Sequence, residues 1–364
     1  MKNKKKVGFA VVGLGAIAQG AVLPAFRHVK RAKLVALVGR DKGKAVKLAR
    51  KYKAQEVYGA EEFGDCLENP AVDAVYLATP QSEHFRATIE AARVGKHVLC
   101  EKPLAVTAEQ SAEMVRVCEE CGVQLMTAYR KYYEPSALYL KKLIQGGKLG
   151  KIDVIHTSFS ELHVPGRSIP WLLDSKVAGG GPLMDLGVYC VNTSRWLAEE
   201  DPVEVSAHAW KKDAERFRDV EEGISFRMQF GSGLVVQGTS TYSSAISSFV
   251  FVQGTKGWAC LTPAFPFDEE RRLTGKIGGK WFEKKFRMVD EFAAELDAFA
   301  EAIQTKKPVA PDGRQGHLDM IILEAIYESA RKGEPVGIRY GLVEVGRSEE
   351  LNTETQRAPR RSRE

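Results

Sequence analysis

Short apolar runs alternate with amphipathic segments of helical spacing over the first third of the chain. The runs have the length of buried strands, and the segments between them repeat their apolar positions with the period of a helix. Alternation of this kind builds a parallel sheet with helices on both faces, joined by right-handed crossovers. We therefore predict an α/β domain with a doubly wound parallel sheet. Its strands are expected at residues 7–12, 33–39, 71–78, 97–100 and 124–128, and its helices at 16–30, 42–53, 82–94 and 108–121.

The pattern changes after residue 129. A helix is predicted at residues 136–146, and long segments of strand character follow it, divided by glycine turns. Helices that begin at the glycines 179–181 and near residues 290–304 and 316–332 are expected to cover the resulting sheet. We predict an α+β domain with a large, open, mostly antiparallel sheet. Its strands are expected at residues 151–162, 203–211, 223–230, 234–242, 248–253 and 281–288.

These patterns divide the chain into a first domain at residues 1–128, a second at 129–345 and a tail at 346–364. The tail is polar and rich in arginine, so we expect it to be disordered. The open face of the second sheet is a natural contact surface between subunits. We therefore expect a homodimer or homotetramer formed through that sheet.

Composition and charge are those of an ordinary globular protein. Of the 364 residues, 44% are hydrophobic and 27% charged, and the net charge of +6 comes partly from lysines and arginines at the two ends. We interpret these as solvated termini and expect no nucleic-acid partner. No apolar run approaches the ~18 residues of a membrane span, so a cytoplasmic protein is expected. The six cysteines show no framework of disulfides or metal ligands, and no metal site is predicted.

A glycine-rich segment follows the first apolar run directly. Gly13, Gly15 and Ala18 form the pattern G-x-G-x-x-A, between a predicted strand and a predicted helix. Gly13 permits a tight turn, Gly15 lets a pyrophosphate approach the backbone, and Ala18 lets helix and strand pack closely. The phosphates would then meet N–H groups at the start of the helix, at Ala16 and Ile17. The first domain is therefore predicted to be a dinucleotide-binding Rossmann domain.

The end of the second predicted strand favours NADP over NAD. Enzymes that use NAD place an acid there to bind the ribose 2′-hydroxyl, but this chain has Gly39 at the expected position. Arg40 can pair with a 2′-phosphate, and Lys42 and Lys44 add positive potential. Asp41 stands one residue late for the ribose, although the geometry of the loop can compensate, so NAD remains the alternative.

Three further motifs make the chain resemble a known family. They are Ala-Thr-Pro-Gln-Ser-Glu-His at residues 78–84, Glu-Lys-Pro at 101–103, and Gly-Gly-Gly-Pro-Leu-Met-Asp-Leu-Gly-Val-Tyr at 179–189. Together with the glycine loop they resemble the glucose–fructose oxidoreductase / inositol dehydrogenase family (Gfo/Idh/MocA), from about residue 6 to 340. The resemblance implies the two domains predicted above, an active site between them, and NAD or NADP as the cofactor.

The resemblance also implies roles for individual residues. Thr79, Pro80 and His84 match the family's nucleotide-contacting loop. Glu101 and Lys102 match its Glu-Lys-Pro motif, in which the lysine faces both the nicotinamide ribose and a substrate hydroxyl.

The second domain departs from the family's common pattern at one position. A histidine usually handles the proton there, and this chain has Tyr189, as in the branch of glucose–fructose oxidoreductase and of aldose, xylose and dihydrodiol dehydrogenases. A tyrosine has a pKa near ~10, so it needs help to act as a base at neutral pH. We expect the Lys102 ammonium to lower that pKa by favouring the phenolate.

These considerations assign the catalytic roles. Tyr189 is the expected general acid/base and Lys102 its electrostatic partner, and both contact the substrate. Asp185 either orients Lys102 or holds a substrate hydroxyl. Each has a structural alternative: Lys102 as a surface lysine, Asp185 as a helix cap, and Tyr189 as a packed aromatic residue.

Three weaker candidates complete the predicted site. Arg130 lies at the end of a strand and is expected to contact the nicotinamide or its phosphate. Trp171 lies in the loop before the glycines, at the expected rim of the substrate site. Asn192 follows Tyr189 by about one helical turn and is expected to reach a substrate hydroxyl.

The predicted protein is thus an NADP(H)-dependent oxidoreductase that transfers hydride between nicotinamide and a sugar or polyol. A trans-dihydrodiol or dicarbonyl reductase is the alternative within enzymes, because it needs the same lysine and tyrosine with a more apolar pocket. The alternative outside enzymes is a non-catalytic NADP-binding regulator of the same fold, against which the presence of Lys102, Asp185 and Tyr189 argues.

Overall fold

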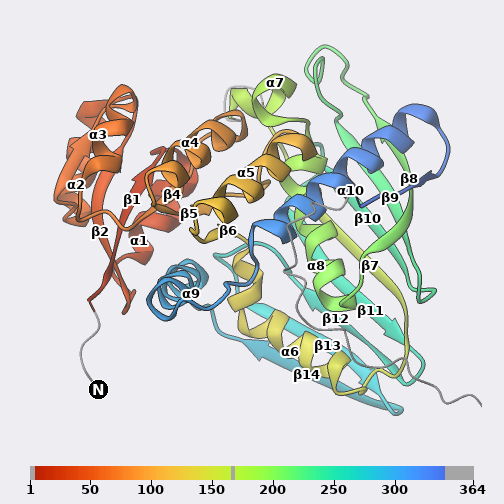
Figure 1. Cartoon of the computed structure of the whole chain (residues 1–364). Helices are drawn as coiled ribbons and strands as arrows, with labels where there is room; N and C mark the ends of the chain where they lie inside the picture. Colours follow the sequence, from red (N-terminus) through yellow and green to blue (C-terminus); the bar gives the residue numbers. More distant parts are fainter. Residues whose placement is uncertain (1–4, 165–168, 341–364) are drawn as a thin grey trace, which may run out of the picture.

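A six-stranded parallel sheet forms the first half of the protein (Figure 1). The computed structural model describes residues 5–164 and 169–340. The strand order is β3-β2-β1-β4-β5-β6, that of a doubly wound Rossmann sheet, as predicted. All six residues of β1 are buried, because helices cover both faces of the sheet. The strands are β1 (Val7–Val12), β2 (Ala32–Val38), β3 (Glu56–Tyr58), β4 (Ala74–Leu77), β5 (His97–Cys100) and β6 (Leu125–Thr127).

The helices of this half correspond to the predicted ones with two corrections. The helix predicted at 16–30 ends after Ala25, where a turn leads into β2, and its middle is a π-helix. The sequence pattern did not predict the short strand β3 or the helix after it, because β3 has only three residues and its first residue is exposed. The helices are η1 (Ala18–Val22), α1 (Leu23–Ala25), α2 (Lys42–Tyr52), η2 (Ala60–Glu62), α3 (Phe63–Glu68), α4 (Gln81–Arg93) and α5 (Ala108–Glu120).

The second half contains a nine-stranded sheet with the order β14-β13-β12-β11-β7-β10-β9-β8-β15. Only β7 and β10 pair in parallel, so the predicted large, mostly antiparallel sheet is confirmed. The sequence pattern did not predict strands β12 and β13, because glycine turns and a run of charged residues obscure the alternation of these two short strands. The strands are β7 (Ile152–Ser160), β8 (Pro202–Trp210), β9 (Gly223–Phe230), β10 (Val235–Thr241), β11 (Ser247–Gly254), β12 (Gly257–Thr262), β13 (Arg271–Ile277), β14 (Lys280–Phe286) and β15 (Val336–Gly337).

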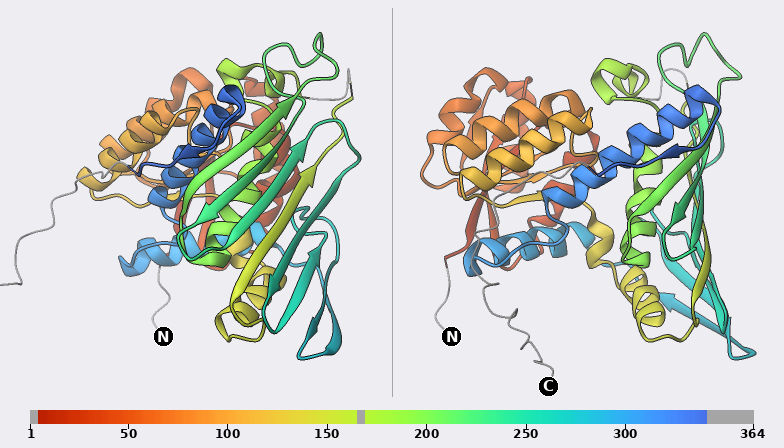
Figure 2. Two further views of the ribbon diagram at one scale, coloured as in Figure 1. Left: turned by 90° about the vertical axis from the view of Figure 1, so that its right-hand side faces the viewer. Right: turned by 45° about the vertical axis from the view of Figure 1, so that its right-hand side comes forward.

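Helices cover only one face of this sheet (Figure 2). The long helix α10 packs on β8 and also contacts α5 of the first half. The opposite face carries no helix of the described residues. The helices of this half are η3 (Arg130–Tyr133), α6 (Pro135–Gln145), η4 (Pro170–Leu173), α7 (Ser175–Ala178), η5 (Leu183–Gly187), α8 (Val188–Ala198), α9 (Glu291–Thr305) and α10 (Gly313–Lys332).

Helix α9 corrects one expectation about the second half. We expected it to cover the antiparallel sheet, but it packs into the core of the parallel sheet. Leu296, Phe299 and Ala300 are completely buried there, and the Phe299 ring lies 6.1 Å from that of Phe9 on β1. A segment near residue 300 therefore contributes to the core of the parallel sheet. The domain boundary after residue 128 remains a prediction. The predicted tail at 346–364 lies outside the described residues.

Candidate active site

The glycine loop lies at the carboxyl end of β1, where the strand order reverses between β1 and β4. Ligands of doubly wound sheets bind at such a point. Gly13 has φ +89°, and a Cβ added to it would lie 2.6 Å from the Ala78 carbonyl oxygen, so only glycine fits. A Cβ on Gly15 would meet no atom within 4 Å. The loop therefore packs closely against Ala78 at Gly13 and is open at Gly15, where a pyrophosphate requires access to the backbone. Ala16 and Ile17 begin the helix and present its first N–H groups.

The loop after β4 adds a second feature that fits a nucleotide. The Thr79 hydroxyl oxygen is buried and has no hydrogen-bond partner among the described residues, and Pro80 immediately precedes α4. A buried hydroxyl without a partner is costly unless a ligand or water completes it. These residues fit a dinucleotide through its phosphates and riboses.

His84 has a different setting from the one expected. Its ring is buried, with one nitrogen 3.0 Å from the Thr79 carbonyl oxygen and the other 3.1 Å from that of Pro103. Burial lowers the pKa of His84, so the ring is neutral and donates only one hydrogen bond. The histidine links the loop after β4 to the Glu-Lys-Pro loop, whose Lys102–Pro103 bond is cis. Its predicted contact with the nucleotide stays a prediction.

At the end of β2, Asp41 is already engaged by the protein. Its carboxylate accepts a hydrogen bond of 2.9 Å from the backbone N–H of Lys44 and so caps α2. The Lys42 ammonium lies 2.8 Å from Glu62, which compensates its charge. Arg40 is exposed and forms no ion pair within the described residues. Arg40 is therefore available to a ribose 2′-substituent, and the half-buried Lys44 also forms no ion pair within the described residues.

The predicted catalytic residues come together from opposite halves of the chain. Lys102 follows β5, and its Nζ donates to the Asp185 carboxylate at 2.9 Å and to the Asp185 carbonyl oxygen at 2.8 Å. The same Nζ lies 4.9 Å from the centroid of the Tyr189 ring. Asp185 belongs to the π-helical turn η5, which runs directly into α8 and Tyr189. A π-turn widens the helix and is frequent at functional sites.

The second oxygen of Asp185 accepts a hydrogen bond of 3.0 Å from the Tyr242 hydroxyl. Tyr242 is completely buried and directly follows β10. The nearby Lys102 lowers the pKa of Asp185 although burial opposes this, and the Asp185 carboxylate raises the pKa of Lys102 against the effect of burial. Both groups are therefore charged at neutral pH. Sequence reasoning missed Tyr242, whose only signal was an aromatic residue at a strand end.

Two cations lie near the ring of Tyr189. The Lys102 ammonium is 4.9 Å and the Arg130 guanidinium carbon 5.1 Å from the ring centroid. Phe159 and Phe265 also pack against it, at 5.8 and 5.6 Å between ring centroids. Burial raises the pKa of Tyr189, and Arg130 and Lys102 oppose this without reversing it. Lys102 thus lowers the pKa of Tyr189 as expected, but burial outweighs both cations and Glu101 and Asp185 add to the rise, so the phenol stays protonated at neutral pH.

Arg130 is committed largely to the protein. Its guanidinium donates to the Phe265 carbonyl oxygen at 2.7 Å and to the Glu291 carboxylate at 3.2 Å. Glu291 lies on α9 and also pairs with the completely buried Arg271. The structure thus places Arg130 against Tyr189, and the predicted contact with nicotinamide stays a prediction. Sequence reasoning did not find Glu291, which is distant in the chain.

Glu101 is held at the carboxyl end of the parallel sheet. Its carboxylate accepts hydrogen bonds from the Tyr76 hydroxyl at 2.8 Å and from the Lys102 backbone N–H at 3.2 Å. Burial raises the pKa of Glu101, and Lys102, Tyr76 and Arg130 offset only part of this rise. Glu101 therefore fixes the loop that carries Lys102.

Two predicted substrate residues have no contact with this cluster. The buried Asn192 amide donates to Asp319 at 2.8 Å, and Asp319 also pairs with Arg195. Trp171 is half-buried in η4. Their roles as substrate ligands remain predictions.

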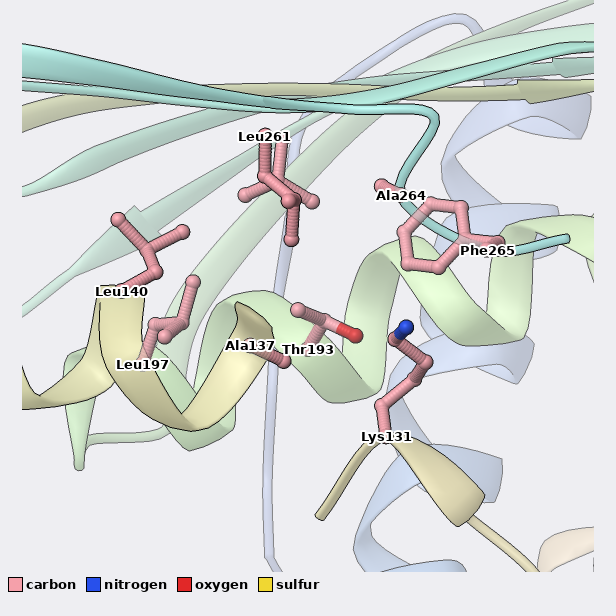
Figure 3. Close-up of a pocket in the computed structure, with 9 residues that line it drawn as sticks. Lys131, Ala137, Leu140, Thr193, Leu197, Leu261, Ala264 and Phe265 are labelled. Carbon is pink, nitrogen blue, oxygen red and sulfur yellow. The ribbon is translucent and has the colours of Figure 1, made fainter. Parts of the chain in front are cut away.

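A small enclosed cavity lies behind Phe265, between α6, α8 and the antiparallel sheet (Figure 3). Its volume of about 10 Å³ has room for roughly one water molecule. Lys131 borders it, and burial lowers the pKa of Lys131 to about 8. The cavity is too small for a sugar or a dinucleotide, so it is separate from the site around Lys102.

A Rossmann sheet with an open glycine loop, together with a lysine and a tyrosine facing each other beside it, defines a nicotinamide-dependent oxidoreductase. Residues 7–129 match the model of the oxidoreductase family with an NAD-binding Rossmann fold, and residues 137–260 match the GFO/IDH/MocA C-terminal domain. The chain belongs to the GFO/IDH/MocA family of oxidoreductases, which confirms the resemblance noted from its motifs.

Relatives whose names state an activity align with most of the chain. D-xylose 1-dehydrogenase [NADP(+)] of Haloarcula marismortui is 32% identical over 89% of this chain and 91% of the relative. Trans-1,2-dihydrobenzene-1,2-diol dehydrogenase of Mus musculus is 32% identical over 65% of this chain and 67% of the relative. The crystal structure of aldose-aldose oxidoreductase from Caulobacter crescentus has a TM-score of 0.88 and 33% identity, over 92% of this chain and 100% of that one.

The ion pair between Lys102 and Asp185 generates a prediction. Asp185→Asn keeps the shape but removes the charge that holds Lys102, so turnover should fall about 100-fold. Dinucleotide affinity should remain close to that of the parent protein, because the carboxylate of Asp185 contacts Lys102 and Tyr242 and the pyrophosphate is expected at the glycine loop. Steady-state kinetics and titration of cofactor fluorescence measure the two effects.

Asp201→Asn is the matched control, since it removes a carboxylate from an ion pair with Arg195 outside the site. Its turnover should be nearly normal. Normal turnover in Asp185→Asn, with the fold confirmed by thermal melting, would show that Lys102 does not depend on Asp185.

Proposed function

We propose that the protein is an NADP(H)-dependent oxidoreductase that transfers hydride between nicotinamide and a carbinol carbon of a sugar or polyol. The observation that carries the proposal is the Lys102–Asp185 ion pair lying against the ring of Tyr189. This arrangement offers a cationic hydrogen-bond donor and a phenol to one substrate oxygen. The names of the xylose dehydrogenase and of the aldose-aldose oxidoreductase support a sugar as the substrate.

The bound dinucleotide supplies the hydride chemistry, and the chain supplies positions and protons. Gly13, Gly15 and the first turn of the helix would hold the pyrophosphate. The Lys102 ammonium donates two hydrogen bonds to oxygen atoms of Asp185, which leaves its third N–H for a substrate oxygen. The protonated Tyr189 hydroxyl donates a proton to that oxygen when a carbonyl is reduced, and the phenolate left by loss of that proton accepts one when an alcohol is oxidised.

A dihydrodiol or dicarbonyl reductase is the second candidate. Phe159 and Phe265 give Tyr189 an apolar surround that suits a flat substrate, and the mouse relative bears that name. A non-catalytic regulator is disfavoured, because such a protein has no need of a lysine and a tyrosine placed together.

A substrate panel tests the function directly. Aldoses, polyols, dihydrodiols and dicarbonyls are offered with NADP(H) and NAD(H), and the change in nicotinamide absorbance is followed. We expect the highest kcat/KM with an aldose or polyol, and loss of nearly all turnover in Tyr189→Phe, which removes only the proton-bearing oxygen. Faster turnover of dicarbonyls or dihydrodiols would instead support the second candidate.

NADP selectivity is proposed to rest on Arg40, because Asp41 caps α2 and Lys42 pairs with Glu62. The mutation Arg40→Ala should weaken NADP binding about 10- to 100-fold, the cost of a lost charge-assisted hydrogen bond, and should change NAD binding little. Binding of both cofactors is measured by fluorescence titration. Arg50→Ala, an exposed arginine near the end of the same helix, is the control. Equal weakening of both cofactors would exclude the proposed selectivity.

We also propose a homo-oligomer formed through the open sheet face. A row of aromatic rings crosses that face: His156 lies 6.1 Å from Phe251, Phe251 lies 5.4 Å from Trp258, and Trp258 lies 5.4 Å from Trp281. Trp281 is 63% exposed. A contiguous aromatic patch of this kind is typical of a protein interface.

Light scattering of the intact protein should therefore give the mass of a dimer or tetramer, and Phe251→Arg should shift it toward the monomer. Leu138→Arg changes an exposed leucine on α6, away from the sheet face, and should leave the mass unchanged. A monomer in the parent protein would rule out this interface.

A cytoplasmic location is proposed as well. None of the helices in residues 5–164 and 169–340 is long and apolar enough to cross a membrane. Fractionation of the source cells tests the location.

A further inference from the structure

The polar groups around Lys102 are mostly paired with one another. Each Asp185 carboxylate oxygen already accepts one hydrogen bond, one from Lys102 and the other from Tyr242, which leaves limited acceptor capacity for a substrate. The Tyr189 hydroxyl and one N–H of Lys102 have no partner within the described residues. These two groups can serve only one substrate oxygen, the one that reacts. A polyhydroxylated substrate needs further partners.

His163 provides an unpaired group of this kind. It follows β7, and its backbone N–H donates to the Tyr242 carbonyl oxygen at 2.9 Å. Its imidazole stacks on the Tyr242 ring, with 3.8 Å between centroids and 14° between planes. Tyr242 in turn donates to Asp185, so the stack places His163 beside the charged pair.

One ring nitrogen of this imidazole has no hydrogen-bond partner within the described residues. His163 is only 4% exposed, and its Nδ1 is buried without a hydrogen bond among the described residues. Stacking on Tyr242 engages the face of the ring and does not satisfy Nδ1. A buried polar atom left in this way costs stability, and such atoms in native proteins usually meet a ligand or water. Burial also lowers the pKa of His163, so the ring is neutral.

We infer that His163 binds a second hydroxyl of the substrate, next to the one that Tyr189 and Lys102 handle. The inference rests on the proposed sugar or polyol function. A neutral imidazole offers one donor and one acceptor, and a hydroxyl can satisfy either. A carbonyl can satisfy only the donor. His163 therefore selects substrates with a hydroxyl near the reacting carbon over dicarbonyls.

The test combines a mutation of the protein with a deletion on the substrate. The best aldose of the panel is compared with its analogues that each lack one hydroxyl, using the full-length parent protein and His163→Ala. In the parent, one deoxy analogue should have a kcat/KM about 10- to 100-fold below that of the complete sugar. In His163→Ala the complete sugar should lose the same factor, whereas that analogue should change by less than about twofold.

The control is His317→Ala, which removes another buried histidine. Its imidazole is already paired with Ser111 at 2.9 Å, between α5 and α10. This variant should keep the full preference for the complete sugar, and all three proteins should bind NADPH equally. A purely structural role of His163 would lower kcat/KM for every sugar by a common factor.

The outcomes separate the inference from the function on which it rests. If the parent protein oxidises no aldose or polyol, the proposed function is wrong and the inference falls with it. If the parent turns over a sugar but every deoxy analogue loses the same factor in both proteins, only the role of His163 is wrong.

Discussion

The ion pair between Lys102 and Asp185 is the interaction on which the arrangement of the site depends. The two residues are 83 positions apart: Lys102 follows β5 of the parallel sheet, and Asp185 lies in the π-helical turn η5 of the second half. Their side chains are only 13% and 19% exposed. A buried ion pair is stable only where its geometry is good and its remaining hydrogen-bonding capacity is used. The Asp185 carbonyl oxygen and the Tyr242 hydroxyl meet that requirement, so the pair fixes the position of an ammonium group as well as its charge.

A second set of buried charges also contacts Tyr189. Arg130, Glu291 and Arg271 form a chain of ion pairs from the Tyr189 ring through α9 to β13. Removal of one member of such a chain leaves an uncompensated charge in the core. The position of the phenol is therefore coupled to a helix that packs on the parallel sheet and to a strand near the edge of the antiparallel one.

The sequence allowed the features that depend on local chemistry to be predicted. Gly13 and Gly15 could be assigned because a strand, a glycine turn and a helix follow within a few residues. Lys102, Asp185 and Tyr189 could be found because the resemblance to a family covered their motifs. The sequence did not allow the roles of Tyr242, Glu291 and His84 to be predicted, because these roles arise from packing between distant segments. Tyr242 lies 57 residues from Asp185, and Glu291 lies 161 from Arg130. The packing of α9 on the parallel sheet could not be predicted for the same reason, since its amphipathic pattern fits either sheet.

The packing of α9 on the parallel sheet has a consequence for how the protein is made. Phe9 emerges from the ribosome long before Phe299, its partner in the core. The amino-terminal sheet can form its strands early and cover part of this face with α1 and α2, but the part that α9 covers stays exposed until most of the polypeptide has been synthesised. Contacts of such long sequence separation slow folding and leave apolar surface exposed in the meantime. A nascent chain of this protein thus carries an incomplete nucleotide domain through most of its translation.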